Sequence, residues 1–292
     1  MFSQPTPPHS GMADIRARLR PMGIGDILDE TFRLYRENFL LFLATAAVLE
    51  VPAQIINTLL SLARPAVTTI VPGQGITPAQ TSAATTGGLI GVVAGLITAF
   101  AGVFITAALA VVVSNRYLGR LTTVGEAYRA TLNRLGPLLV TTIWAGIRLV
   151  LLGFACVVII GIPFLIYFAV AWSLLPQVVM LENVDRGASG RSRELIRGYW
   201  WKTLGLYIVV AILAYLLVFV ILVPVVAGIF AGAGVTGTRL LTGLATLIFS
   251  LLVRPIQTVA TTLLFYDLKI RKEAFDLETM AQQAGFAAPT RY

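Results

Sequence analysis

Long apolar runs alternate with short amphipathic stretches along this chain, and the alternation occurs three times. Before each pair of apolar runs, apolar residues recur three or four positions apart, as one face of a helix requires. In the first two copies these positions are Ile24, Ile27, Leu28, Phe32, Tyr35 and Phe39, then Val124, Ala127, Tyr128, Leu132, Leu135 and Leu139. A fainter third copy has Ala188, Leu195, Ile196 and Tyr199, interrupted by Arg191 and Ser192. The pattern predicts a basic helix at the membrane surface followed by two spans, three times over.

The apolar runs are long enough to cross a bilayer, since a helical span needs about 20 apolar residues. Six segments qualify, at about residues 39–64, 89–114, 138–160, 163–181, 203–231 and 240–266. The predicted fold is an all-α polytopic membrane protein with six transmembrane helices and three cytoplasmic interfacial amphipathic helices, in three repeated units. We expect a membrane domain over residues 20–280, between a disordered cytoplasmic tail at 1–19 and a second cytoplasmic tail at 281–292.

Local signals mark several boundaries between these segments. Gly161-Ile-Pro163 is typical of a tight turn and is expected to separate the third and fourth spans. Residues 65–88 are rich in Thr, Gly and Pro and are expected to form one polar loop. Thr123 and Glu126 have the spacing of a capping box, so the second surface helix should begin there.

Composition and charge placement support the membrane assignment. Hydrophobic residues make up 57% of the chain and charged residues 12%, a balance that excludes a water-soluble domain. Arginines and lysines gather before the first span, between the second and third, between the fourth and fifth, and after the sixth. The opposite side has only Arg64 and Arg239. The positive-inside rule therefore predicts a bacterial inner-membrane protein with both termini in the cytoplasm.

The residues that most soluble enzymes need are scarce. His9 is the single histidine and Cys156 the single cysteine, so no Ser–His, Cys–His or histidine-based metal site can be assembled. We expect no metal, no cofactor and no catalytic residue. Arginines interleaved with acidic residues beside apolar spans fit a membrane surface better than a nucleic-acid groove.

Three ionisable residues fall within the predicted spans: Glu50, Arg148 and Arg254. From the end of the first amphipathic stripe to Glu50 is ~16 Å of helix and from the second to Arg148 ~14 Å, so both should lie near the bilayer midplane. Buried charge is costly in lipid unless it is paired or hydrated. Glu50 and Arg148 could form a structural ion pair. Alternatively, because one carboxylate cannot neutralise two guanidiniums, the three could line a site for an anionic ligand.

Basic residues flanking the fifth and sixth spans are candidates for contact with lipid. A collar of positive charge against anionic headgroups is expected, and Asp267 should pair with a nearby cation. The candidate anionic-lipid contacts are Arg191, Arg193, Arg197, Lys202, Lys269, Arg271 and Lys272. The expected partners are membrane lipids with anionic headgroups, together with a possible membrane or cytoplasmic protein.

Three stretches resemble a bacterial membrane-domain family named after glycerophosphoryl diester phosphodiesterases. They run from Arg20 to Arg36, from Trp172 through Glu182 and on to Trp200, and, most specifically, from Phe265 to Glu278. The likeness covers roughly residues 18–280. It implies a multi-span helical domain without an established activity of its own. The enzyme of the family's name is a separate soluble barrel with paired histidines and acidic metal ligands, which has no counterpart in these residues.

Three functional hypotheses follow. The first is a non-enzymatic integral membrane module that binds lipid or scaffolds partner proteins. The second is a transporter or lipid-translocating protein that uses Glu50, Arg148 and Arg254. The third, an intramembrane phosphodiesterase or other hydrolase, is disfavoured because no nucleophile and base can be paired.

Overall fold

A computed structural model describes residues 21–65, 77–155, 161–184 and 187–283 of the chain. Within these ranges the regular structure is entirely helical. The helices are α2 (Ile24–Glu37), α3 (Phe39–Ala63), α4 (Pro78–Tyr117), α5 (Val124–Asn133), α6 (Leu135–Ala155), α7 (Gly161–Ala171), α8 (Leu175–Leu181), α9 (Ala188–Ile196), α10 (Trp200–Phe230) and α11 (Gly234–Gln283). Cys156 and the predicted tail at 1–19 lie outside the described residues.

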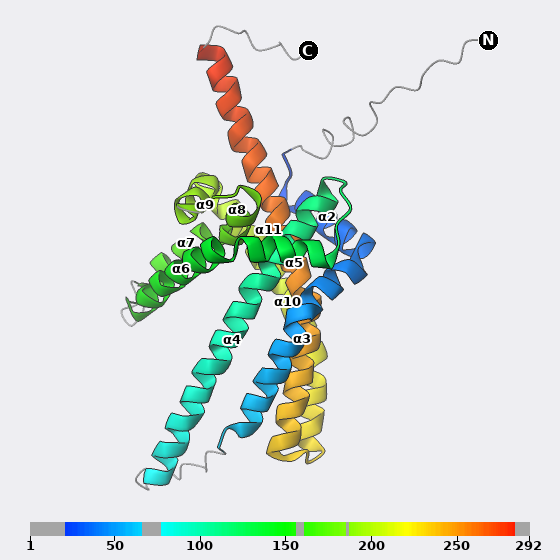
Figure 1. Ribbon diagram of the computed structural model, residues 1–292, viewed down its shortest axis with the longest axis vertical. Coiled ribbons are helices and arrows are strands. Elements are labelled where there is room, and N and C mark those ends of the chain that lie inside the picture. The colour runs from blue at the N-terminus through cyan, green and yellow to red at the C-terminus, as the bar shows by residue number, and fades with distance from the viewer. Residues whose placement is uncertain (1–20, 66–76, 156–160, 185–186, 284–292) are drawn as a thin grey trace, which may run out of the picture.

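In the part of the chain that the structure describes, six helical segments are long and apolar enough to cross a membrane, and the chain is an all-α polytopic membrane protein. The segments are Phe39–Ala63, Pro78–Tyr117, Leu135–Phe154, Gly161–Leu181, Trp200–Phe219 and Gly234–Glu273. Figure 1 shows α3, α4, α10 and α11 running together, while α6 and α7 project sideways. The short helices α2, α5, α8 and α9 gather around α11 at one end, called here the short-helix end. The other end of α3, α4, α10 and α11 is called the far end.

The expected loop at 65–88 is wrong in its second half, because α4 already begins at Pro78. Thr77 and Gln80 form a capping box: the Thr77 hydroxyl accepts from the Gln80 N–H and the Gln80 amide oxygen accepts from the Thr77 N–H. Proline at the first helical position favours the same start. This helix-start signal is present in the sequence, inside a stretch whose Thr and Gly content suggested a loop.

The boundary between the third and fourth spans also differs from the expectation. Gly161 begins α7, so Gly161–Pro163 lie in the first turn of a helix, where a proline costs no hydrogen bond. The fourth span is not continuous: α7 ends at Ala171 and α8 starts at Leu175. At the chain end, α11 continues to Gln283, so the start of the expected tail at 281–292 is helical.

The three short helices that precede a pair of spans bury corresponding positions one helical turn apart. Each contributes a small or apolar residue and, four positions later, a hydroxyl residue: Ile27 and Thr31, Ala127 and Thr131, Ala188 and Ser192. The two threonine hydroxyls donate to the carbonyl four residues earlier. The Ser192 hydroxyl donates to the Ala171 carbonyl of α7 over 2.8 Å. Ser192, expected to interrupt the buried face, therefore belongs to it, because its hydroxyl is satisfied inside the protein.

The second short helix begins where the sequence predicted. The Thr123 hydroxyl accepts from the Glu126 N–H, and the Glu126 carboxylate accepts from the Thr123 N–H over 2.8 Å. These hydrogen bonds to Thr123 hold the pKa of Glu126 below its ordinary value. The capping box is confirmed.

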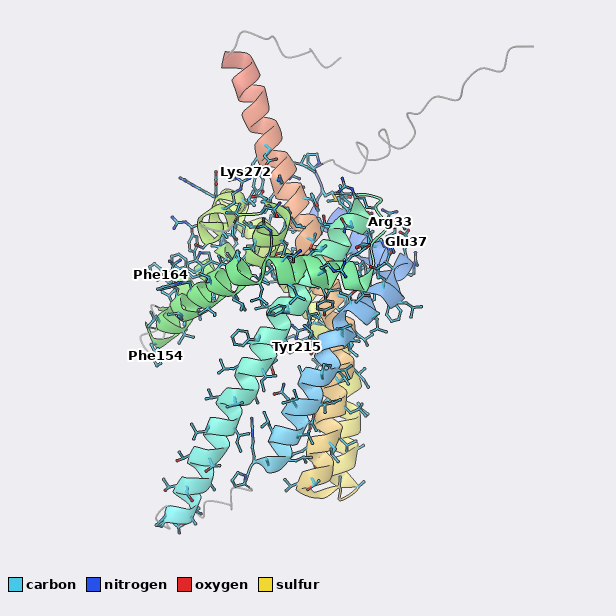
Figure 2. The ribbon with its side chains drawn as sticks, viewed as in Figure 1. Arg33, Glu37, Phe154, Phe164, Tyr215 and Lys272 are labelled. Atoms are coloured by element: carbon cyan, nitrogen blue, oxygen red, sulfur yellow. The ribbon has the colours of Figure 1, made fainter. Side chains whose placement is uncertain are left out.

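The buried core lies at the short-helix end. The buried residues of α4 run from Gly102 to Tyr117, and those of α3 from Phe42 to Glu50. Away from this core the helices expose apolar side chains, and Figure 2 shows Phe154 and Phe164 at the tip of the α6–α7 pair. An apolar surface of this kind suits a lipid environment.

Arg239 ties the far end of α11 to the last turn of α3. Its guanidinium donates to the carbonyls of Leu62 and Arg64, over 3.4 and 3.0 Å. The last carbonyls of a helix lack intrahelical partners, and a cation there is favourable. One of the two positive charges on this side is therefore used to cap a helix.

Replacing Ile27 with alanine should destabilise the protein, because the Ile27 side chain is fully buried where α2 packs against the rest of the bundle. The expected loss is about 2–5 kcal/mol in the free energy of unfolding, measured by SDS titration in mixed micelles. Leu40→Ala on α3, where the side chain is 77% exposed, should have little effect. Equal losses for the two variants would contradict the docking of α2 through this face.

Candidate functional site

Glu50 and Arg254 form an ion pair inside the helix bundle. Glu50 lies near the middle of α3, and its side chain is 8% exposed. The Arg254 Nε of α11 lies 3.1 Å from Glu50 Oε2, and the Nη2 donates to Oε1 over 3.5 Å. The contact between Arg254 Nε and Glu50 Oε2 is an ion pair, but its angles do not fit a hydrogen bond. The pair neutralises two charges that would each be costly to bury alone.

A third helix and a short helix complete the surroundings of this pair. At Gly102 of α4, a Cβ atom would lie 2.8 Å from Arg254 Nη1, so any other residue there would require the guanidinium to move. Tyr128 of α5 donates its hydroxyl to the Thr45 carbonyl of α3 over 2.7 Å. Burial, with a smaller contribution from the negative charge of Glu50, raises the pKa of Tyr128. The phenol therefore stays neutral beside the carboxylate.

The expected ion pair between Glu50 and Arg148 is wrong. Arg148 lies on α6, which packs against α7 and α8, whereas α3 packs against α4 and α11. The Arg148 guanidinium lies 5.7 Å from the centre of the Trp172 ring, in a cation–π contact. Equal depth along two helices does not bring two side chains together, because depth says nothing about which faces meet. The structure thus brings together two of the three intramembrane charges and separates the third.

A line of buried hydroxyl groups on α11 leads from Arg254 toward the short-helix end. The Thr258 hydroxyl donates to the Arg254 carbonyl, and the Thr261 hydroxyl donates to the Thr258 carbonyl. Gln177 of α8 donates to the Thr261 hydroxyl over 2.9 Å. The Tyr266 hydroxyl, ~18 Å along the helix from Arg254, shares a 2.6 Å hydrogen bond with Ser114 of α4. Polar contacts thus join α11 to α8 and α4.

Asp267 holds the start of the first short helix against two spans. Its carboxylate is fully buried and accepts from the Met22 N–H over 2.7 Å and from Arg271 Nε over 3.0 Å. Lys202 of α10 pairs with the same carboxylate. Lys202 and Arg271 also donate to the Met22 carbonyl, over 2.6 and 2.9 Å. Asp267 was expected to pair with a cation, but Lys202 and Arg271 were expected to contact lipid; both instead bind the chain itself.

A second charged cluster joins the α8–α9 connection to α11. Arg191 makes two contacts with Glu182, at 2.8 and 3.1 Å, and one with Glu273 at 3.1 Å. Lys269 lies 3.3 Å from Glu182. Burial acts to raise the pKa of Glu182, but the hydrogen bonds from Arg191 and the charge of Lys269 outweigh it, so the pKa lies below its ordinary value. The same contacts raise the pKa of Arg191.

The remaining candidate lipid contacts differ in their surroundings. Lys272 donates to the Glu194 carbonyl. Arg193 and Arg197 are exposed, and within the described ranges no carboxylate lies within ion-pair distance of either. Of the seven predicted contacts, these two therefore present their charge to the surroundings. The cations that pair internally could not be told apart from them by residue type.

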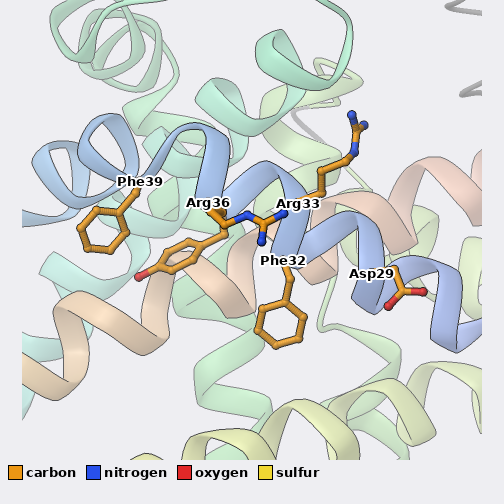
Figure 3. A pocket seen from close by; sticks show the side chains of 6 residues that line it. Asp29, Phe32, Arg33, Arg36 and Phe39 are labelled. Atoms are coloured by element: carbon orange, nitrogen blue, oxygen red, sulfur yellow. The ribbon is translucent and has the colours of Figure 1, made fainter.

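Two cavities meet at Phe32 of α2. The first, of about 750 Å³, is lined by Asp29, Phe32, Arg33, Tyr35, Arg36 and Phe39. Figure 3 shows the Phe32 and Phe39 rings below α2, with Arg36 between these two phenylalanines. The Arg33 guanidinium lies on the opposite side of the helix. The second cavity, of about 260 Å³, is apolar and lies against α10 and α11; Phe32 lines it too.

Contacts of α2 keep this pair of cavities in place. The Tyr35 hydroxyl donates to the Leu252 carbonyl of α11 over 3.3 Å, and burial raises its pKa. Arg33 pairs with Glu30 and Glu37, whereas no carboxylate of the described chain lies within ion-pair distance of Arg36. Phe32 is 44% exposed, so its ring borders both the protein and the surroundings. The sequence placed Phe32 and Phe39 on the apolar stripe, but could not show the space beside them.

Comparison with protein-family models, with curated proteins and with solved structures finds no match to this chain. The resemblance described from three stretches of the sequence stays a prediction. In the part of the chain that the structure describes, no three His, Cys, Asp or Glu side chains gather closely enough to hold a metal ion.

Replacing Glu50 with glutamine should leave the Arg254 charge buried without a partner. We expect a loss of about 3–5 kcal/mol in the free energy of unfolding for Glu50→Gln, and recovery of part of that loss when Arg254→Gln is added. SDS titration of the two single variants and the double variant measures the coupling. Arg148→Gln is the matched control, and its effect should simply add to that of Glu50→Gln. Additive losses for Glu50 and Arg254 would contradict the ion pair.

Acidification should weaken the Glu182 cluster. Because the folded-state pKa of Glu182 is lowered, its stabilisation is fully present above the unfolded-state value of about 4.3 and is lost as the pH falls through the folded-state value. Melting temperatures in detergent between pH 7 and about pH 3 should fall for the wild type and fall less for Glu182→Gln. Glu194→Gln, whose side chain is 63% exposed, provides the control and should keep the wild-type profile. An unchanged profile in Glu182→Gln would show that other groups cause the loss.

Proposed function

We propose that this protein is a non-enzymatic membrane module that holds a glycerophospholipid against α2, α10 and α11. The observation that carries the proposal is the pair of cavities that share Phe32. One cavity is lined by charged and aromatic side chains of a short helix, and the other by apolar side chains of two spans. A molecule that fills both must have a polar end and an apolar chain, which is the description of a lipid.

The polar end of the lipid is assigned to the first cavity. Arg36 has no ion-pair partner in the described chain and lines this cavity, so a lipid phosphate there would meet a guanidinium. Arginine binds phosphate oxygens through paired hydrogen bonds, and such charge-assisted bonds are about twice as strong as neutral ones. Tyr35 and Phe39 suit the interface between headgroups and acyl chains, where aromatic rings are enriched.

The acyl chain is assigned to the second cavity. Its lining includes Leu213 and Leu217 of α10 and Val253 and Ile256 of α11, and is almost free of polar surface. A chain lying there would contact protein on one side and bulk lipid on the other. Lipid anchored at a fixed place on a bundle supports a role in organising lipid or in positioning a partner protein at the membrane.

The proposal includes an orientation in the membrane. The short-helix end would face the cytoplasm of a bacterial cell, with α2, α5 and α9 at the inner surface and both termini on that side. The exposed Arg193 and Arg197 of the α9 region would then meet anionic headgroups, each contributing about 1 kcal/mol of attraction near the surface.

Native mass spectrometry of protein purified in mild detergent tests the lipid site. The wild type should retain a phospholipid, and Arg36→Gln should weaken retention about tenfold, the effect of losing one charge-assisted hydrogen bond. Leu213→Trp, which places an indole in the apolar cavity, should also reduce retention. Titration with phosphatidylglycerol and with phosphatidylethanolamine shows whether the site prefers an anionic headgroup.

Matched variants separate the site from general contact with lipid. Leu222→Trp changes the same helix at a side chain that is 49% exposed and does not line the cavity, so it should retain lipid like the wild type. Arg36→Lys keeps the charge and should retain part of the binding. If Leu213→Trp and Leu222→Trp hold the same amount of lipid, the proposed site is wrong.

A further inference from the structure

The helices that reach the far end contribute positive charge there and no negative charge. Arg64 directly follows α3, and Arg239 lies near the start of α11. The sequence contains no Asp or Glu at residues 51–125 or 195–266, which include the parts of α3, α4, α10 and α11 that reach this end and the connections between them. No carboxylate of these segments can therefore neutralise either guanidinium.

Both arginines have hydrogen-bond donors that the described chain does not use. Arg239 donates through Nη1 to the carbonyls of Leu62 and Arg64, and its Nε and Nη2 make no hydrogen bond in the described residues. The Arg64 guanidinium has neither a hydrogen bond nor an ion pair among these residues, and its Nε is buried. A buried donor without an acceptor is costly, so an acceptor from outside the chain would stabilise this end.

Arg64 lies at the depth where the apolar part of α4 begins. Its Nη2 packs against Gly91 of α4, where a Cβ atom would lie 3.4 Å away. The apolar run of α4 starts at Leu89, whereas the preceding turns, residues 78–88, consist mainly of small and polar residues. In a membrane-spanning helix such a transition corresponds to the boundary between acyl chains and headgroups. The guanidinium of Arg64 is therefore at the depth of lipid phosphates.

A groove between α3 and α11 begins beside these two arginines. The two helices pack against each other, and the groove has a volume of about 330 Å³ (Figure 1). Leu62 and Leu240 line it next to the arginines, and Gln54 and Leu247 line it further into the bundle. From Leu62 to Gln54 the helix rises ~12 Å. The groove thus runs from the arginines into the apolar part of the two spans.

The groove is apolar and open to the surroundings. Gln54 and Thr58 are its only polar lining residues in the described chain. A Cβ atom at Gly243 of α11 would collide with the Thr58 side chain of α3, so the two helices approach closely at the floor of the groove. Leu59 and Leu244 also line it and are 60% and 57% exposed. These are the properties of a site for an acyl chain.

We propose that the far end binds an anionic phospholipid, with its phosphate against Arg64 and the unused donors of Arg239, and one acyl chain in the groove. Guanidinium groups bind phosphate oxygens through charge-assisted hydrogen bonds. A free phosphate would leave the groove unfilled. A second copy of the chain would bring no carboxylate on its own far-end helices to the arginines. A phospholipid supplies both the negative charge and the apolar chain.

This site does not depend on the proposed lipid site at Phe32. The two share no lining residue, and Phe32 lies on α2 at the short-helix end, whereas the groove begins at the far end. Leu213→Trp should therefore leave the far-end site unchanged, and substitution of Arg64 should leave the Phe32 site unchanged. Either site can fail its test while the other passes.

Titration of the full-length protein with phosphatidylglycerol in mild detergent, read by native mass spectrometry, tests the far-end site. The Leu213→Trp variant serves as the parent, so that binding at Phe32 contributes little. Arg64→Gln should raise the Kd for phosphatidylglycerol about tenfold, equivalent to a loss of about 1.4 kcal/mol. Arg64→Lys should retain part of the affinity. Diacylglycerol, which lacks the phosphate, should bind the parent and Arg64→Gln equally.

Matched variants separate this site from general contact with lipid. Arg129→Gln removes an exposed arginine of α5 at the short-helix end and should bind phosphatidylglycerol like the parent. Leu244→Trp fills the groove and should weaken binding. Ile248→Trp changes the same helix at a side chain that is 46% exposed and does not line the groove, so it should have no effect.

Equal affinities for Arg64→Gln and Arg129→Gln, or for Leu244→Trp and Ile248→Trp, would overturn the proposal. A change of oligomeric state in Leu244→Trp with unchanged lipid affinity would also overturn it, because the groove would then be a contact between copies of the chain. Unchanged melting temperatures confirm that the variants fold.

Discussion

Asp267 is fully buried, and a buried carboxylate is tolerated only when positive charge and hydrogen-bond donors surround it. The main chain of Met22, together with Lys202 and Arg271, supplies these contacts, so one side chain fixes the start of α2 against α10 and α11. Of the two cavities that share Phe32, the first is lined by α2 and by Phe39 of α3, and the second lies between the same three helices, α2, α10 and α11. Their geometry therefore depends on an electrostatic contact some distance from their walls. Apolar packing alone could not set this geometry, because lipid offers apolar side chains an equivalent environment.

The hydrophobic pattern was sufficient to predict the architecture. Six runs of apolar residues correspond to six helical segments of the described chain, the fourth of which is divided into α7 and α8, and the capping box at Thr123 marks the start of α5. These signals are local, since each depends on residues within a few turns of one another. The partner of Glu50 is not a local property. Arg148 and Arg254 both lie at suitable depth, and the choice between them depends on which helix faces meet and on the space that Gly102 leaves for a guanidinium. No spacing within a single sequence contains that information.

The cations at the short-helix end illustrate the same limit. Lys202, Arg191 and Arg193 are alike in residue type and lie within a short stretch of chain, yet the first two pair with buried carboxylates and the third is exposed. Of the carboxylates that decide this, Asp267 lies 65 residues after Lys202, whereas Glu182 lies only 9 residues before Arg191. The structure shows that the cations at this end have two different roles. Paired cations hold the helices in place, whereas Arg36, for which the described residues show no ion pair, lines the cavity proposed to hold a lipid phosphate.

Arg239 bears on how the protein is assembled in the bilayer. In the proposed orientation its guanidinium would cross the hydrocarbon with the α10–α11 hairpin, and its acceptors are the carbonyls of Leu62 and Arg64 at the end of α3. Those acceptors exist only once α3 has inserted and its last turn has formed. The order of synthesis provides this, because α3 leaves the ribosome long before α11. The hydrogen bonds of Arg239 can thus form only after the other spans are in place. They connect the α10–α11 hairpin to the end of α3, and so favour the completed bundle over partly inserted intermediates.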